Sequence, residues 1–174
     1  MSEQPTRAEG TPAGQHVIDL FWSTPAVPTR GPRPKTSLSE IVAAAVALAD
    51  AEGFDALSMR TLAKSVGVGA MTLYTYVPGK AELFELMIDA AYAERPLPSH
   101  DLPWRERYQE HAAAALQMYR RHPWLVEANL WRLPLGPHVL DINEDLLQIG
   151  QAAGLPLNVG MRVASLLEAY TFGI

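Results

Sequence analysis

The sequence predicts an all-α protein, with a compact unit of short helices at residues 37–82 and a longer helical body at residues 83–174. Two observations favour this fold class. Apolar residues recur at helical spacing in successive segments, and Pro or Gly separates those segments. No stretch shows the alternation of apolar and polar residues that is typical of a strand. We refer to the two parts as the N-terminal unit and the helical body.

Composition narrows the class of protein. Hydrophobic residues make up 48% of the 174 residues and charged residues 19%, so the chain can bury a core and is not disordered as a whole. The absence of cysteine excludes disulfides and thiolate metal sites, and it favours a reducing cytoplasm. The start lacks the pattern of a secretory signal, and no apolar run approaches the roughly 20 residues that span a bilayer.

The charge is unevenly distributed. A net charge of −5 argues at first against a nucleic-acid partner. Residues 30–80, however, carry six basic and four acidic side chains, whereas residues 81–174 carry seven basic and twelve acidic ones. A nucleic acid would therefore bind the N-terminal unit, and the acidic body would have another task.

Residues 1–36 predict a mobile arm, because they are rich in Pro, Gly, Thr and Ser and hold six of the fourteen prolines. The arm contains one apolar patch, Ile18 with Leu20, Phe21 and Trp22. This patch either folds back onto the protein or docks on a partner. Arg30, Arg33 and Lys35 end the arm directly before a helix, where they either reach phosphates and the minor groove or form a plain linker.

The first helix of the unit begins with a capping box. The Ser37 hydroxyl can accept from a free backbone amide, and Glu40 can reach back to the amide of Ser37. Gly53 supplies the stop. The helix carries an apolar stripe that we expect to be buried: Leu38, Ile41, Ala45, Leu48 and Ala49.

The next two helices follow each other closely. Ser58 is the N-cap of a helix that buries Met59, Leu62, Ala63 and Val66. Gly67 allows a sharp left-handed turn, and Val68 is expected to be buried beneath this turn. A short helix then covers about residues 69–76. Pro78-Gly79 then opens a fourth helix at about residues 80–94. A helix, a Gly turn and a short helix together predict a helix-turn-helix.

The second helix of such a motif presents its N-terminal end to the major groove of DNA. Gly69, Ala70, Met71 and Thr72 form a small tip that can approach base edges, while Leu73 and Val77 face the core. Other side chains supply phosphate or base contacts: the hydroxyls of Tyr74 and Tyr76, Lys80 with the free amides beside it, and the guanidinium of Arg60.

Residues 57–80, LSMRTLAKSVGVGAMTLYTYVPGK, closely resemble the DNA-binding motif of the TetR family of bacterial transcriptional regulators. The likeness is specific over residues 38–90, and beyond residue 95 it is mainly architectural. The segment Arg-Gly-Pro-Arg-Pro at residues 30–34 is similar to that of members with an extended N-terminal arm.

The resemblance implies roles for individual residues. Arg60 would contact bases or phosphates; Gly69, Ala70 and Met71 would read bases; and Thr72, Tyr74, Tyr76 and Lys80 would hold the backbone. Thr75, Arg33 and Lys35 complete the predicted DNA-binding set. The tip lacks the long polar side chains that hydrogen-bond to base edges. Ala70 and Met71 offer only apolar contact, for instance to thymine methyls. Base specificity would then depend on Arg60, the arm and DNA shape.

The helical body is expected to hold helices at about residues 104–121, 124–132, 137–153 and from 157 onward. By resemblance it would form a small-molecule pocket and, with the last helices, a dimer face. Tyr108, His111 and Met118 share one helical face, which we rank first as the pocket wall. Each candidate could also be plain core; the whole ligand-binding set is Trp104, Tyr108, His111, Met118, Trp131 and Tyr170. The chain stops within an apolar helix, which predicts that the fold continues further.

No cofactor, metal site or enzyme is expected. His111, His122 and His138 lack metal-binding spacing, and no nucleophile triad or phosphate loop appears. The expected function is a ligand-responsive regulator, most naturally a repressor. It would bind a palindromic double-stranded operator as a homodimer and release it for an apolar or aromatic effector. The rivals are a small-molecule carrier whose helix-turn-helix no longer reads DNA, and a protein that only makes interactions.

Overall fold

The computed structural model describes residues 12–22, 36–127 and 134–173, and within these ranges the regular elements are all helices, which confirms the predicted all-α class. None of these helices is long and apolar enough to cross a membrane. In chain order they are α1 (Pro12–Trp22), α2 (Leu38–Glu52), a 3-10 turn η1 (Phe54–Ala56), α3 (Met59–Val66), α4 (Ala70–Tyr74), α5 (Lys80–Tyr92), α6 (Trp104–Arg121), α7 (Trp124–Glu127), α8 (Pro137–Ala152) and α9 (Leu157–Phe172).

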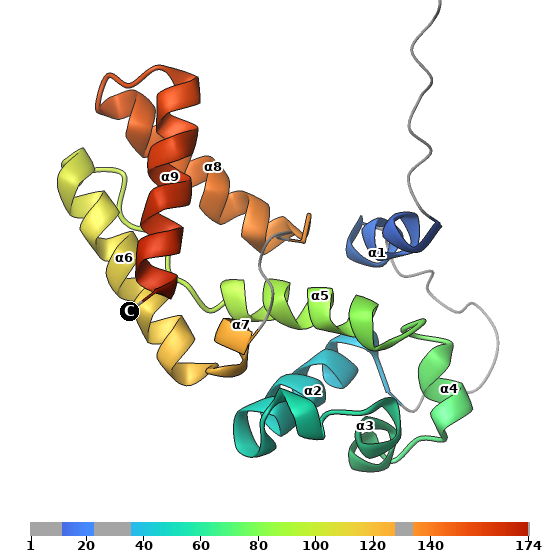
Figure 1. Cartoon of the computed structure of the whole chain (residues 1–174). Helices are drawn as coiled ribbons and strands as arrows, with labels where there is room; N and C mark the ends of the chain where they lie inside the picture. Colours follow the sequence, from blue (N-terminus) through green and yellow to red (C-terminus); the bar gives the residue numbers. More distant parts are fainter. Residues whose placement is uncertain (1–11, 23–35, 128–133, 174) are drawn as a thin grey trace, which may run out of the picture.

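Helix α5 lies between the two parts of the molecule (Figure 1). The N-terminal unit, α2 to α4, lies below α5 in this view, and α8 and α9 of the helical body lie above it. Helix α5 contacts both α2 and α8. The boundary expected at residues 82–83 therefore falls inside one uninterrupted helix, so the two parts share α5 instead of being joined by a linker.

The predicted start of α2 is confirmed. The Ser37 hydroxyl accepts from the amide of Glu40 at 3.2 Å, and Glu40 accepts from the amide of Ser37 at 2.8 Å. The Ser37 amide, with the hydroxyls of Thr36 and Ser37, lowers the pKa of the Glu40 carboxyl. Three members of the apolar stripe, Ile41, Ala45 and Ala49, are buried.

The helix-turn-helix forms where it was predicted. Ser58 caps α3 in a second capping box, in which the partner is Thr61. Gly67 ends α3 in the left-handed conformation, with φ at 75°. Leu73 and Val77 are fully buried, as expected, while Val68 is only half-buried. The turn is therefore held by backbone geometry and by the core below α4.

The arm predicted to be mobile contains the helix α1, so that expectation is wrong for residues 12–22. Val17 is buried, and Leu20 and Phe21 pack against the core. The indole Nε1 of Trp22 donates to the carbonyl of Leu135 at 3.0 Å. The abundance of Pro and Gly suggested an irregular arm, but apolar residues at helical spacing gain more by packing beside α5. The apolar patch thus folds back onto the protein.

The start of α8 depends on a side chain from α5. Asp89 is buried, and its Oδ1 accepts from the backbone amide of Val139 at 3.0 Å, which satisfies one of the free amides of α8. A β-carbon on Gly136 would lie 2.2 Å from that same oxygen. Glycine is thus required at position 136 for α5 and α8 to meet in this way.

Replacing Gly67 with Ala should lower the free energy of unfolding by about 1 kcal/mol, because an alanine is strained at positive φ. A β-carbon there would meet no atom within 4 Å, so backbone strain is the only penalty. Urea unfolding followed by circular dichroism measures the change. The control is Gly69→Ala, where φ is −70° and the added carbon would lie 3.7 Å from Thr72 Oγ1. An equal loss in both variants would contradict the argument.

Candidate nucleic-acid interface

The short helix α4 presents one row of residues to solvent and one to the core. Exposed residues run along its outer side, and the apolar Met71 is 80% exposed. Leu73 points inward and is fully buried. The exposed members of the predicted DNA-binding set are Arg60, Gly69, Ala70, Met71, Thr72, Tyr74 and Thr75. The structure thus leaves most of the predicted contacts accessible to solvent.

A notch of about 570 Å³ lies between α3 and α4. Arg60 and Lys64 border it from α3, and Ala70 borders it from α4. Sequence reasoning missed Lys64 as a candidate contact. Its position one helical turn after Arg60 was the available signal, because residues four apart share a helix face. The two cations make this edge of the motif a natural place for phosphate.

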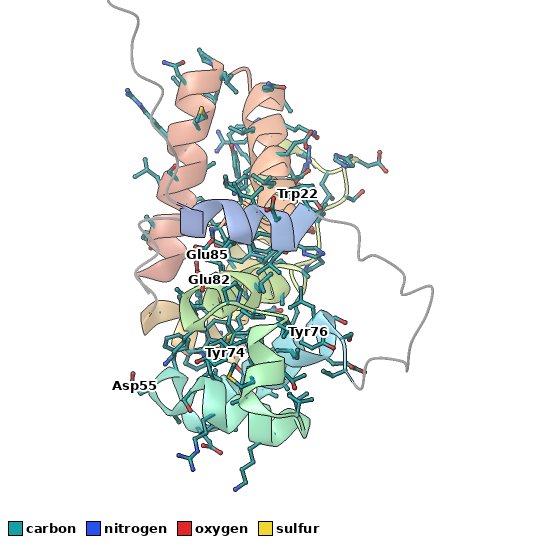
Figure 2. The ribbon with its side chains drawn as sticks, turned by 90° about the vertical axis from the view of Figure 1, so that its right-hand side faces the viewer. Trp22, Asp55, Tyr74, Tyr76, Glu82 and Glu85 are labelled. Carbon is teal, nitrogen blue, oxygen red and sulfur yellow. The ribbon has the colours of Figure 1, made fainter. Side chains whose placement is uncertain are left out.

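Two residues expected to hold the DNA backbone are engaged within the protein. The Tyr76 hydroxyl donates to the carbonyl of Thr36 at 3.0 Å. The Lys80 ammonium donates to the carbonyl of Phe54 at 3.2 Å and lies 4.3 Å from the centre of the Phe54 ring. In Figure 2, Tyr74 and Tyr76 lie on either side of the α4 segment. Arg33, Lys35 and Trp131 lie outside the described residues.

The predicted ligand-binding residues are only partly brought together. Tyr108, His111 and Met118 lie on α6; His111 and Met118 are buried, and Tyr108 donates to the carbonyl of Leu146 at 3.3 Å. Trp104 packs edge-on against Tyr108, with ring centroids 6.3 Å apart. Tyr170 is 71% exposed, so it does not join them as a buried wall.

A buried polar cluster lies inside the helical body. Arg107 and His111 both bond the carboxylate of Asp145 on α8, and Arg95 binds Glu168 on α9 through two hydrogen bonds of 3.2 and 2.8 Å. His111 Nδ1 has no hydrogen-bond partner, and the same holds for the Nε atoms of Arg95 and Arg107. Burial lowers the pKa of His111, against the opposing effect of Asp145. A neutral His111 that donates through Nε2 leaves Nδ1 as a free acceptor.

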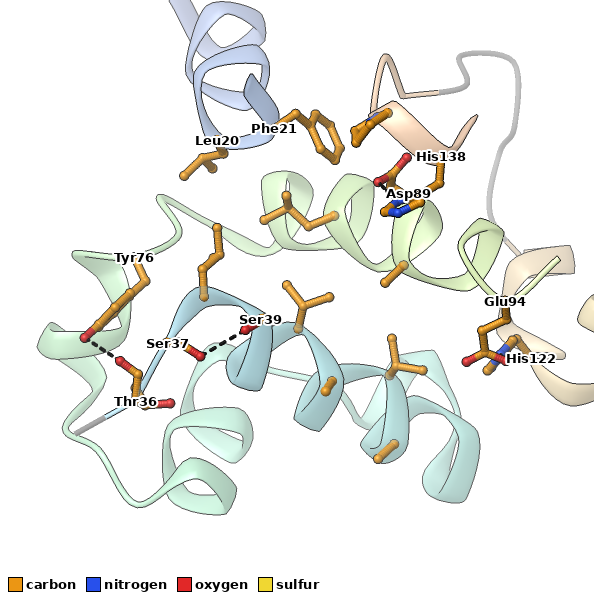
Figure 3. Close-up of a pocket in the computed structure, with 18 of the residues that line it drawn as sticks. Leu20, Phe21, Thr36, Ser37, Ser39, Tyr76, Asp89, Glu94, His122 and His138 are labelled. Carbon is orange, nitrogen blue, oxygen red and sulfur yellow. Dashed lines mark hydrogen bonds and ion pairs between the residues drawn. The ribbon is translucent and has the colours of Figure 1, made fainter. Parts of the chain in front are cut away.

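A cleft of about 1110 Å³ opens between α1, α2 and α5 (Figure 3). Leu20 and Phe21 of α1 form one apolar part of its lining, and Val42 of α2 and Leu86 of α5 also line it. His138, which bonds Asp89, and His122, which bonds Glu94, lie toward its edges. None of the predicted ligand-binding residues that the structure describes lines this cleft. In the described part of the chain, no group of His, Asp and Glu residues is arranged to hold a metal ion.

Two family models match the chain. Residues 41–87 match the model described as bacterial regulatory proteins, tetR family. Residues 96–174 match the tetracyclin repressor-like C-terminal domain. The chain belongs to the TetR family. The first matched range ends within α5 and the second begins just after it. This agrees with the place of α5 between the two parts.

Individual TetR-family relatives support the assignment. The HTH-type transcriptional repressor DrrR1 of Streptomyces coeruleorubidus is 39% identical over 170 residues, which is 97% of this chain and 63% of the relative. This chain therefore spans less than two thirds of that relative. ActR of Streptomyces coelicolor in complex with actinorhodin superposes with a TM-score of 0.74 at 29% identity, covering 79% of this chain and 66% of that one. BioQ with its double-stranded DNA operator gives a TM-score of 0.71 at 26% identity, covering 79% and 84%.

Acidification should destabilise the protein partly through His111. The pKa of His111 in the folded protein lies below the ordinary value of 6.5, so the unfolded chain takes up the proton first. The destabilisation caused by His111 is therefore absent above pH 6.5 and grows as the pH drops toward the lowered pKa. Urea unfolding between about pH 7.5 and pH 5 measures this slope. In His111→Gln the slope should be shallower. His100→Gln, which removes a ring that is 70% exposed, should keep the original slope; equal slopes in all three proteins would refute the assignment.

Proposed function

We propose that the protein is a ligand-responsive transcriptional repressor that binds a palindromic DNA operator as a homodimer and releases it when a small molecule binds the helical body. The observation that carries the proposal is the exposed outer row of α4, held from below by the buried Leu73. A short helix fixed in this way can enter the major groove without losing its support. Such a regulator would act in the cytoplasm, where bacterial DNA lies, and it would have no catalytic activity.

The geometry suggests how DNA would be contacted. Ala70 and Met71 can approach thymine methyls, and Thr72, Tyr74 and Thr75 offer hydroxyls to phosphates beside them. Arg60 and Lys64 would add positive charge at the notch. Tyr76 and Lys80 contribute differently: their contacts with Thr36 and Phe54 fix the ends of α4 and α5, and Lys80 would reach phosphate only by leaving the Phe54 carbonyl.

The inner face of α6 is the effector surface that we favour. Tyr108, His111 and Met118 line it, and the free Nδ1 of His111 would accept a hydrogen bond from a hydroxyl or amine of the ligand. An apolar or aromatic molecule with one such donor would suit these groups. ActR, which has been solved with actinorhodin and with (S)-DNPA, is a relative in which a ligand complex is known.

The outer surface of α9 supports the proposed dimer. This helix exposes large apolar side chains that a single chain leaves in water: Leu157, Met161, Leu166 and Tyr170. A second copy, alone or together with further helices, would cover them. Two-fold symmetry would then match two half-sites of the operator about one turn of DNA, or a small multiple of it, apart.

The test measures binding to a duplex that the protein selects from a random pool. Arg60→Ala should weaken binding about 10- to 100-fold, because it removes a guanidinium that can form two hydrogen bonds. Tyr74→Phe should weaken binding about 3- to 10-fold, because it removes one hydrogen bond. Fluorescence anisotropy across a salt series gives both affinity and salt slope, and wild-type affinity should fall steeply as salt rises. Arg120→Ala, at an exposed position on α6, is the matched control and should bind normally.

Absence of specific binding at low salt, or unchanged binding in both variants, would contradict the proposed interface. If an apolar ligand still bound tightly in that case, the protein would be a small-molecule carrier that keeps a helix-turn-helix without reading DNA. The internal partners of Tyr76 and Lys80 are the observation that favours this second candidate.

A further inference from the structure

His122 lies in the turn between α6 and α7, where the helical body meets the N-terminal unit. The side chain is 2% exposed, and its ring reaches two carboxylates from other elements. Nδ1 is 2.8 Å from Oδ1 of Asp50, which lies in the last turn of α2. Nε2 is 3.3 Å from Oε2 of Glu94, just beyond α5, and Figure 3 shows the His122 ring beside Glu94. One imidazole therefore joins three separate segments.

The two contacts specify a protonation state. An ionised carboxylate only accepts hydrogen bonds, and a neutral imidazole carries a single N–H. Both bonds can therefore form together only when both ring nitrogens are protonated. Burial alone would raise the pKa of Glu94, but hydrogen bonds from Arg121 and His122 outweigh it and hold that pKa below its ordinary value. The same Oε2 of Glu94 accepts from Arg121, so the bond between Glu94 and His122 is formed by a proton on the ring.

The charges around the ring balance only in this state. Asp50 faces it from α2, Glu94 from beyond α5, and Arg121 from α6, where it binds Glu94. From α7, the indole of Trp124 donates to the same Asp50 oxygen at 2.7 Å. With a protonated ring, two cations face two anions. Loss of a ring proton leaves one carboxylate in excess and turns a nitrogen lone pair toward an oxygen, which is unfavourable at a buried position.

Aromatic contacts continue from this junction toward α4. The ring of Trp124 is 6.0 Å from that of Phe84, and Phe84 is 4.4 Å from Phe54, centre to centre. Lys80, the first residue of α5, packs on Phe54 and donates to its carbonyl. A contiguous set of packed side chains therefore connects the His122 turn to the end of the N-terminal unit that carries α4.

We propose that the doubly protonated ring of His122 is the positioning residue that fixes the N-terminal unit against the helical body, and that loss of one ring proton releases this junction. The inference rests on the proposed function only for its effect on DNA, where it would add a response to pH to the response to an effector.

The absence of cysteine allows a direct test, because two introduced cysteines can carry spin labels without background. Ser65→Cys in α3 and Gln151→Cys in α8 are both exposed and lie on opposite sides of the junction. Pulsed electron resonance measures the distance between the labels, with labelled chains diluted in unlabelled protein. We expect one narrow distribution at a pH where nitrogen NMR finds two ring protons on His122, and a broadened or displaced one at a pH where it finds one.

Three variants separate positioning from plain packing. His122→Gln should lose the narrow distribution at both pH values. His122→Arg, which keeps a permanent charge and several donors, should restore it at both. The matched control is His138→Gln: His138 contacts Asp89 through Nδ1 alone at 2.8 Å, so a neutral ring suffices there, and the pH response should persist.

Nitrogen NMR of wild-type histidines, with His122 assigned by its loss in His122→Gln, reports the ring protons directly. The narrow distribution should disappear together with the second ring proton. The proposal is overturned if the distribution stays narrow while His122 carries one proton, or if it broadens at a different pH. These readouts need no DNA. A pH-sensitive junction without DNA binding would refute the proposed function alone, and DNA binding with a pH-insensitive junction would refute this inference alone.

Discussion

The bond between the Asp89 carboxylate and the start of α8 fixes how the helical body packs on α5. A buried carboxylate without partners would be strongly destabilising, so Asp89 needs both the amide of Val139 and the ring of His138. The same bond explains why Gly136 cannot carry a side chain. Further along the chain, Glu94 and Arg95 repeat the arrangement with partners on α6 and α9. The C-terminal end of α5 is therefore tied to the helical body by polar groups, while its apolar residues pack toward α2.

Elements determined by near neighbours could be predicted from the sequence. The capping box at Ser37, the N-cap at Ser58 and the left-handed Gly67 depend on residues three or four positions away, and each formed as expected. The helix α1 escaped prediction because its stability depends on distant contacts, such as the bond from Trp22 to Leu135, 113 residues further on. Composition, which is a local average, indicated an irregular arm there.

The candidate site also combines features that near neighbours determine with features that depend on distant contacts. Helical spacing was sufficient to separate the buried Leu73 from the exposed Met71 and Thr72. It could not show that the Tyr76 hydroxyl is bound to Thr36, 40 residues earlier, or that Lys80 is bound to Phe54, 26 residues earlier. A shared helical face brought Tyr108 and His111 together, but the carboxylate that holds His111 comes from another helix. Partners of polar side chains depend on tertiary packing, which a single sequence does not display.

The length of α5 converts small changes at one end into larger ones at the other. A helix of 13 residues spans about 20 Å along its axis, at 1.5 Å per residue. A tilt of about 5° at the C-terminal end would therefore carry the Lys80 end through about 1.7 Å. Base contacts tolerate errors of only about 0.5 Å. In the proposed repressor, α5 would therefore need no large rearrangement of the helical body to move α4 out of register with a groove of DNA.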